Sequence, residues 1–186
     1  LNHFLSVADI APAHVDRLLA AAFMLKSMRP AQRGDYRPLG GKSIALLFEK
    51  PSLRTRVTFE VAVSELGGRP IYLGPQEVGI GKRESAADVA RNLSRWVHGI
   101  VIRTFKHEIA ADLVRNATVP VINALTDREH PCQALGDIMT ILERKRRLKE
   151  TRLTFVGEGN NVCNSLLFGA AKTGMSMNVA CTRGYG

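Results

Sequence analysis

The chain has 186 residues, of which 45% are hydrophobic and 23% charged, enough for one good-sized core or for one domain followed by part of another. No apolar run is long enough to span a bilayer and no basic-then-apolar leader is present, so we expect neither a membrane partner nor a signal peptide. The formal net charge of +9 calls for an anionic partner, but the positive residues are spread along the chain and aromatics make up only 6%, which favours a small phosphorylated substrate over nucleic acid.

Short apolar runs alternate with helix-like patterns along the chain, as is typical of a parallel α/β sheet flanked by helices. A turn-rich stretch at 29–42 and a glycine-rich loop at 74–83 interrupt this alternation. The expected strands are 43–48, 70–73, 99–103, 119–123, 153–156 and 177–181. The expected helices are 6 or 12 to 28, 52 to the glycines at 67 and 68, 85–96, 108–116, 133–148 and 162–172.

The end of the long predicted helix marks the expected boundary between two domains. Residues 1–148 would form the first domain, and 149–186 the beginning of a second, Rossmann-like α/β domain. One strand–helix–strand unit cannot close a core of its own, so we expect the second domain to be incomplete in these residues. The first residue is Leu, which suggests that the chain is part of a longer product.

The most informative segment is Phe-Glu-Lys-Pro-Ser-Leu-Arg-Thr-Arg at 48–56, where the first predicted strand ends and a helix begins. Ligands of such folds bind at this edge of the sheet, and a helix N-terminus offers unpaired N–H groups to an anion. Ser52 and Thr55 add hydroxyls, while Arg54 and Arg56 add guanidinium groups that suit phosphate oxygens. The alternative is an ordinary serine cap beside two solvated arginines, but two arginines flanking a threonine directly after a buried strand favour a phosphate site.

Two further polar segments lie at the same predicted edge. Arg103 ends the strand 99–103 and is expected to point into the crevice above the sheet, although alone it could equally be a surface residue. His130 and Gln133 open the long helix, where Pro131 suits the first turn. The imidazole and the amide could bind a carbonyl oxygen and an –NH2 group; a capping histidine and a surface glutamine are the alternative. No second ligand stands at metal spacing from His130, so no metal or other cofactor is expected.

The three cysteines, Cys132, Cys163 and Cys181, include no close pair. They form neither a zinc pattern nor a disulfide framework, so we expect a reducing, cytoplasmic location. Each is expected to be a small buried residue.

The Ser-x-Arg-Thr-Arg motif at 52–56, the Arg-Thr strand end at 103–104 and the His-Pro-x-Gln motif at 130–133 together resemble the aspartate/ornithine carbamoyltransferase family. The likeness covers essentially the whole chain, including Gly-Lys-Arg-Glu-Ser at 81–85. The two longer motifs, in this order and on the expected elements, are highly specific.

The resemblance implies a set of contacts to carbamoyl phosphate. The residues that would bind its phosphate are Ser52, Leu53, Arg54 and Thr55, and those that would bind its carbamoyl group are Arg103, His130 and Gln133. Thr55, Arg103 and His130 would form the catalytic set, because negative charge builds on the carbonyl oxygen when an amine attacks. Lys82 would reach into a neighbouring subunit's site, and the family likeness implies a homotrimer or a multiple of trimers. The alternative for the loop that carries Lys82 is a mobile surface segment.

The turn at 156–162 resembles the Asp-Gly-Asn-Asn turn of the ornithine branch of the family, in which the second Asn contacts ornithine. That residue is Asn161 here, and Glu158 stands where Asp is usual. Residues 48–51 and 184–185 favour the same branch. The resemblance therefore implies carbamoyl phosphate and L-ornithine as substrates, with L-citrulline and phosphate as products.

Other interpretations stay open. The amine could instead be putrescine, aspartate or an acylated ornithine, or the chain could be a non-catalytic module that binds carbamoyl phosphate. A nicotinamide-binding domain has only a partial G-x-G-x-x-G pattern in its favour, with Val162 at the third glycine. The family's Asp-x-x-x-Ser-Met-Gly and His-Cys-Leu-Pro segments, which bind and assist the amine, are not in these residues. We therefore expect little or no turnover from the 186 residues alone.

Overall fold

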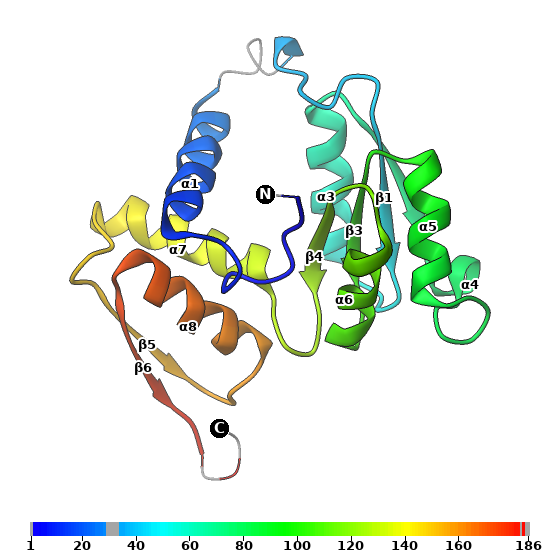
Figure 1. Ribbon diagram of the computed structural model, residues 1–186. Coiled ribbons are helices and arrows are strands. Elements are labelled where there is room, and N and C mark those ends of the chain that lie inside the picture. The colour runs from blue at the N-terminus through cyan, green and yellow to red at the C-terminus, as the bar shows by residue number, and fades with distance from the viewer. Residues whose placement is uncertain (1, 29–33, 183, 185–186) are drawn as a thin grey trace.

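The computed structural model describes residues 2–28, 34–182 and 184, and its central feature is a four-stranded sheet (Figure 1). The strands are β1 (Ser43–Phe48), β2 (Arg69–Leu73), β3 (Gly99–Arg103) and β4 (Val121–Leu125), in the order β2-β1-β3-β4. All neighbouring strands pair in parallel. Their carboxyl ends therefore meet at one edge, where Phe48 lies beside Arg103 and Arg103 beside Leu125.

Helices connect and cover the strands, and the predicted α/β class is confirmed. The helices are α1 (Pro12–Ser27), α3 (Leu53–Glu65), α4 (Pro75–Val78), α5 (Ala86–Trp96), α6 (His107–Asn116), α7 (Pro131–Lys145) and α8 (Asn161–Thr173). A second, two-stranded parallel sheet is formed by β5 (Arg152–Val156) and β6 (Ser176–Ala180). None of the helices in the described ranges is long and apolar enough to cross a membrane.

Several predicted bounds differ from the observed ones, most clearly those of β4 and α7, and the glycine-rich loop contains the unpredicted short helix α4. The strand predicted at 119–123 runs from Val121 to Leu125, because Pro120 has no N–H to donate to the ladder. The long helix ends at Lys145 and not at 148, because Arg146 adopts a left-handed backbone with a φ of 61°. Residues 29–33 of the predicted turn-rich stretch lie outside the described residues, as do 185–186.

The alternation of side chains along β1 and β3 divides the core between the two faces of the sheet. On one face, α5 and α6 cover Ala45, Leu47, Ile100 and Ile102. On the other face, Phe59 of α3 packs with Leu46, Phe48 and Val101. The helix α3, whose first turn lies at the carboxyl edge, is thus held on a fully buried hydrophobic layer.

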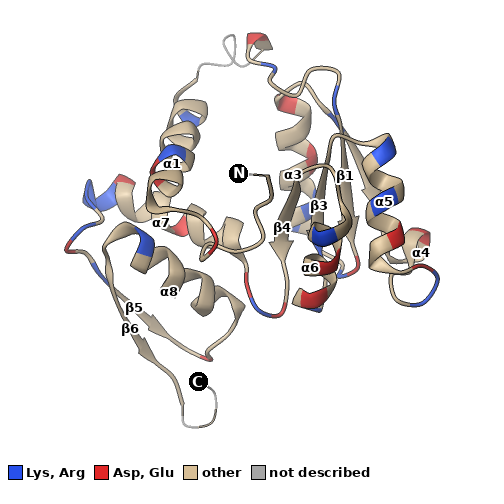
Figure 2. Cartoon of the chain, viewed as in Figure 1, with Lys and Arg blue, Asp and Glu red and all other residues tan. Residues whose placement is uncertain are grey.

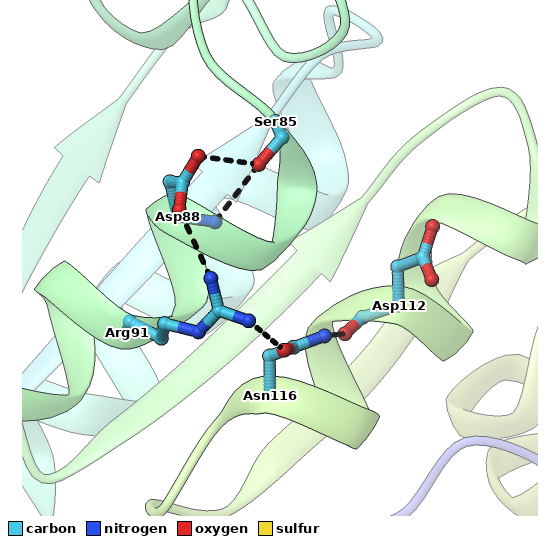
Figure 3. Close-up of polar contacts among 5 residues, drawn as sticks. All are labelled: Ser85, Asp88, Arg91, Asp112 and Asn116. Atoms are coloured by element: carbon cyan, nitrogen blue, oxygen red, sulfur yellow. Dashed lines mark hydrogen bonds and ion pairs between the residues drawn. The ribbon is translucent and has the colours of Figure 1, made fainter.

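A polar network joins α5 to α6 on the outside of the sheet (Figure 3). Ser85 caps α5 by accepting from the backbone N–H of Asp88 at 3.1 Å. Arg91 donates to Asp88 at 3.1 Å and to the side-chain oxygen of Asn116 on α6 at 2.8 Å. These bonds fix the start of α5, and with it one end of the loop that carries Lys82.

The helix α8 shares a second core with α1 and α7 (Figure 1). Gly169 faces α7 closely, because a Cβ there would lie 2.4 Å from Cδ1 of Ile138 and would require that side chain to shift. The buried members of this core are Ile10, Val15, Leu19, Ile138, Ala170 and Met175. Residues on both sides of the predicted boundary at 148/149 thus pack together, and the division into two domains stays a prediction.

The charge distribution agrees with the prediction (Figure 2), whereas the burial of the cysteines agrees only in part. Cys163 is buried and Cys132 half-buried, but Cys181 is exposed because it follows β6, whose residues are mostly exposed. The prediction of three buried cysteines is therefore wrong for Cys181. Lys and Arg side chains are distributed over many elements (Figure 2), and the run 144–147 lies at the end of α7, where cations complement the helix dipole.

Candidate active site

The first turn of α3 forms one wall of a cavity at the carboxyl edge of the sheet. Ser52 is the N-cap of α3, and its hydroxyl accepts from the backbone N–H of Thr55 at 3.3 Å. The strand β1 and the extended backbone of Ser52 place the start of α3 at this edge, so that Arg54 and Thr55 line the cavity. A helix N-terminus carries partial positive charge, so this wall suits an anion.

Arg103 forms the floor of the cavity at the end of β3. It is 9% exposed, and one terminal guanidinium nitrogen donates to Oγ1 of Thr55 at 3.2 Å. Its Nε is buried and has no partner among the described residues. The pairing of β3 with β4 shifts register between Ile102 and Arg103, an irregularity of the kind that re-aims a side chain beside a site. Burial lowers the pKa of Arg103 from its usual value, because the surroundings stabilise the cation less well than water does.

His130 faces the same cavity from the start of α7. Burial, followed by the positive charge of Arg103, lowers the pKa of His130 to about 4. The imidazole is therefore neutral near pH 7 and carries a single N–H. Nδ1 is buried without a partner in the described part of the chain. An unpaired buried N–H costs more than an unpaired lone pair, which favours the proton on Nε2. His130 makes no side-chain cap bond, so the capping alternative does not apply to it.

Gln133 lies one turn into α7 and lines the cavity as well. Its Nε2 donates one of its two hydrogens to Oδ1 of Asp137 at 2.9 Å, and the carbonyl oxygen remains to accept from a ligand. An –NH2 group is the ligand that such an acceptor suits.

These side chains enclose a space of about 550 Å³. The residues that line it are Ser52, Arg54, Thr55, Thr58, Phe59, Arg103, Leu125, His130, Cys132 and Gln133. The structure therefore brings together six of the residues proposed for carbamoyl phosphate. The seventh, Leu53, is not among the lining residues and its side chain is 79% exposed, so only its backbone could contribute.

Arg56 was expected to add a second cation to the anion site, and this expectation is wrong. Its Nε donates to Oε1 of Glu60 at 2.9 Å, and its guanidinium lies 3.6 Å from the ring centroid of Tyr72. Residues two apart on a helix do not share a face, so Arg54 and Arg56 cannot both point into the cavity.

Lys82 and Asn161 lie away from the cavity within this chain. Lys82 is exposed in the loop between α4 and α5, and α4 and α5 lie at the side of the sheet remote from α7 (Figure 1). Asn161 begins α8, and its side-chain amide donates to the carbonyl of Thr126 at 2.7 Å. This bond ties α8 to the loop that precedes His130. The assignments of Lys82 to a neighbouring subunit's site and of Asn161 to ornithine stay predictions.

Several residues of the site were not predicted from the sequence. Thr58 and Phe59 lie one helical turn beyond Arg54 and Thr55, so the helical period could have identified them. Cys132 lines the cavity, and burial raises the pKa of its thiol to about 12, which leaves it protonated.

Glu129 and Ser165 were also missed, and they hold the loop that ends at His130. Glu129 is 1% exposed and Ser165 fully buried, and their side chains are joined by a hydrogen bond of 3.2 Å. No sequence pattern indicated that contact, because Ser165 lies on another helix, 36 residues along the chain.

No group of three His, Cys, Asp or Glu residues in the described ranges is placed to hold a metal ion. The donors in the cavity are hydroxyls, guanidinium groups, an imidazole and an amide, which suit an oxyanion and a carbonyl group.

Residues 2–143 match the family described as aspartate/ornithine carbamoyltransferase, carbamoyl-P binding domain. Curated relatives include the ornithine carbamoyltransferases of Anoxybacillus flavithermus, with 48% identity over 98% of this chain, and Halalkalibacterium halodurans, with 50% identity over 97%. The matches cover 58% and 56% of those proteins, so the chain spans somewhat more than half of their length.

Solved structures give the same result for the fold. The ornithine carbamoyltransferase from Pyrococcus furiosus superposes with a TM-score of 0.95 and 43% identity, over 99% of this chain and 58% of that one. The enzyme from Thermus thermophilus superposes with a TM-score of 0.91 and 47% identity, over all of this chain and 63% of that one.

Proposed function

This chain belongs to the aspartate/ornithine carbamoyltransferase family, and from that premise we propose that its protein transfers the carbamoyl group of carbamoyl phosphate to the side-chain amine of L-ornithine. The products are L-citrulline and phosphate. The observation that carries the proposal is the convergence of Arg54, Thr55, Arg103 and His130 on one cavity at the carboxyl edge of the sheet.

The phosphate group of carbamoyl phosphate would lie at the first turn of α3. The backbone N–H groups at Leu53 and Arg54 precede the first intrahelical bonds and can donate to phosphate oxygens. The guanidinium of Arg54 and the hydroxyls of Ser52 and Thr55 supply further donors on the same side.

The carbamoyl group would lie deeper, between Arg103, His130 and Gln133. Arg103 and the neutral His130 can both donate to the carbonyl oxygen, while the free oxygen of Gln133 can accept from the –NH2 group. Thr55 accepts from Arg103, so its own hydroxyl hydrogen would be free to donate to the same oxygen. The buried guanidinium of Arg103 attracts negative charge on that oxygen strongly, because its surroundings screen the interaction less than water would.

In the reaction, the lone pair of the neutral amine attacks the carbamoyl carbon. A C–N bond forms, the bond between that carbon and the phosphate oxygen breaks, and the electron pair of the broken bond leaves with phosphate. An ammonium substrate gives up two protons in all, one of which ends on phosphate and one in solvent. Thr55, Arg103 and His130 stabilise the negative charge that develops on the carbonyl oxygen. The N-terminus of α3 and Arg54 stabilise the departing phosphate.

For the amine, we propose that Asn161 contributes its side-chain oxygen to ornithine, since its amide nitrogen is bonded to Thr126. We further propose that Lys82 completes the site of a neighbouring subunit in a homotrimer or a multiple of trimers. An exposed cation in the loop between α4 and α5, away from the cavity of its own chain, fits that role.

The test is citrulline formation from carbamoyl phosphate by the complete natural protein, with putrescine, aspartate and N-acylated ornithine as competing amines. We expect turnover with L-ornithine and little with the others. Preference for another amine would replace the ornithine assignment but keep the transfer reaction. For the 186 residues alone we expect binding of carbamoyl phosphate with little or no turnover. Absence of that binding by calorimetry, in the complete protein as well, would end the proposal.

A further inference from the structure

Glu129 is a buried carboxylate next to His130 that the proposed reaction does not use. It is 1% exposed, and no Lys, Arg or His within the described ranges forms an ion pair with it. A carboxylate in the interior must be hydrogen-bonded. Its Oε2 accepts from the backbone N–H of Val7 at 3.2 Å and from the hydroxyl of Ser165 at 3.2 Å.

Ser165 connects this carboxylate to the backbone of His130. Its Oγ accepts from the N–H of His130 at 2.9 Å and is itself completely buried on α8. A hydroxyl has one hydrogen, so donation to Glu129 turns a lone pair of Ser165 toward the His130 N–H. The three groups therefore form one directed chain from carboxylate to hydroxyl to peptide.

The imidazole of His130 depends on its backbone for its position. Its Nδ1 has no hydrogen-bond partner in the described part of the chain, and its pKa is lowered because the ring is buried. No carboxylate or carbonyl of the described residues orients the ring through Nδ1, so the peptide of His130 and its packing set where Nε2 lies.

Other bonds fold the loop, but they do not reach His130 itself. The N–H of Thr126 donates to the carbonyl of Glu129 at 2.9 Å, and Asn161 bonds the carbonyl of Thr126. Asn164 of α8 donates to the carbonyl of Arg128 at 3.0 Å. Ser165 alone among these α8 side chains contacts the residue that lines the cavity.

We propose that Ser165 and Glu129 are positioning residues, which hold the peptide of His130 so that its imidazole meets the developing oxyanion. This inference rests on the proposed function. A displacement of about 1 Å can cost about 10²-fold in rate, because the donor then misses the oxyanion. The ground-state binding of carbamoyl phosphate depends mainly on α3 and should change little.

The first test is Ser165→Ala in the complete natural protein. We expect kcat to fall about tenfold, with the KM for carbamoyl phosphate within about twofold of its original value. The matched control is Thr173→Ala, which removes a hydroxyl from the other end of α8 that bonds only the carbonyls of Gly169 and Ala170. Glu129→Gln keeps the shape and an acceptor oxygen, and we expect a smaller loss of kcat; it also serves if Ser165→Ala fails to fold.

The decisive measurement is the same substitution in a His130→Ala background. If Ser165 acts through His130, Ser165→Ala lowers kcat no further there, within about twofold. An equal, additive loss in both backgrounds would show a merely structural role and overturn the proposal.

NMR of the histidine ring separates this inference from the proposed function, because it needs no turnover. With labelled histidine, Ser165→Ala should shift the His130 ring signals in the presence of inorganic phosphate, while Thr173→Ala leaves them unchanged. Unmoved ring signals would refute the positioning role even in an active enzyme. Moved ring signals in a protein that carbamoylates no amine would support the positioning role and reject the reaction.

Discussion

The helices α3 and α8 both begin in a short loop after a strand, and each has a capping side chain bonded to its first backbone N–H groups. Ser52 caps α3 through the N–H of Thr55, and Asn160 caps α8 through those of Val162 and Cys163. Their first turns nevertheless serve different purposes. Arg54 and Thr55 of α3 line the cavity, whereas the polar side chains at the start of α8 bond to the loop 126–130.

The difference shows that a strand–loop–helix pattern in the sequence predicts where a helix begins. The pattern does not determine whether the helix start faces a ligand cavity or another part of the chain. The start of α3 lies at the edge of the four-stranded sheet beside the buried guanidinium of Arg103. The start of α8 lies against another loop, whose carbonyl groups take up its amide donors. The substitutions below test how completely the two starts divide substrate binding from loop support.

The largest effect is expected from Arg103→Ala, which removes the buried cation beside α3. Loss of one oxyanion donor should lower kcat about 10²- to 10³-fold, because Thr55 and His130 remain. The measurement is citrulline formation by the complete natural protein at saturating substrates. Arg115→Ala, which removes a surface arginine of α6 bonded to Asp112, is the control and should be neutral. A loss no larger than the control's would contradict the assignment.

The next largest effect is expected from Arg54→Ala, for which Arg56→Ala on the same helix is the matched control. Arg54→Ala should raise the dissociation constant of carbamoyl phosphate about 10- to 100-fold, because a charge-assisted hydrogen bond is lost. Arg56→Ala should change it less than about twofold, since Arg56 lies on Tyr72 and bonds to Glu60. Calorimetry with each variant decides the matter, and equal losses would mean that both arginines reach the ligand.

A pH-dependent effect follows from the neutral imidazole at the start of α7. The pKa of His130 is about 4 in the folded chain, whereas that of histidine in an unfolded chain is about 6.5. Between these two pH values the unfolded chain therefore binds more protons than the folded chain. The free energy of unfolding therefore has its full value above about pH 6.5 and decreases as the pH falls toward 4. Relative to His130→Gln, the free energy of unfolding should fall by about 1 to 2 kcal/mol across this window, after allowing for partial solvent exposure. Urea unfolding of both proteins at pH 7, 5.5 and 4.5 measures it; parallel curves would exclude the lowered pKa.

The smallest effect is expected at the start of α8. Asn161→Ala removes the bond to Thr126 and should lower the free energy of unfolding by about 1 kcal/mol. If Asn161 also binds ornithine, the KM for ornithine rises, while Asn164→Ala leaves it unchanged. Thermal unfolding and amine kinetics of both variants separate loop support from substrate binding. An unchanged ornithine KM in Asn161→Ala would limit this residue to loop support.

Much of the fold was predictable because its signals are local. Each strand of the main sheet is a short, mainly apolar segment, and the helix α3 begins after a recognisable serine cap. The anion site followed from the same logic, since Arg54, Thr55, Arg103 and His130 each lie where an element starts or ends.

The remaining features depend on contacts that sequence spacing does not contain. Arg56 lies two residues after Arg54 and shares its residue type, but its partners Tyr72 and Glu60 are identified only by the packing of α3 beside β2. Ser165 reaches His130 because α8 packs on α7 in a shared buried core, a contact between distant segments. The early end of α7 at Lys145 follows from the left-handed backbone of Arg146, a conformation that glycine usually supplies.

The N-terminal residues extend the main sheet at its β4 edge. Phe4 donates its N–H to the carbonyl of Val121 and accepts from the N–H of Asn123, both at 2.8 Å, while His3 accepts from the N–H of Val121. An edge strand with free N–H and carbonyl groups is a template for pairing with another chain. His3 and Phe4 thus cover the edge of β4, and without their hydrogen bonds β4 would present free N–H and carbonyl groups to another chain.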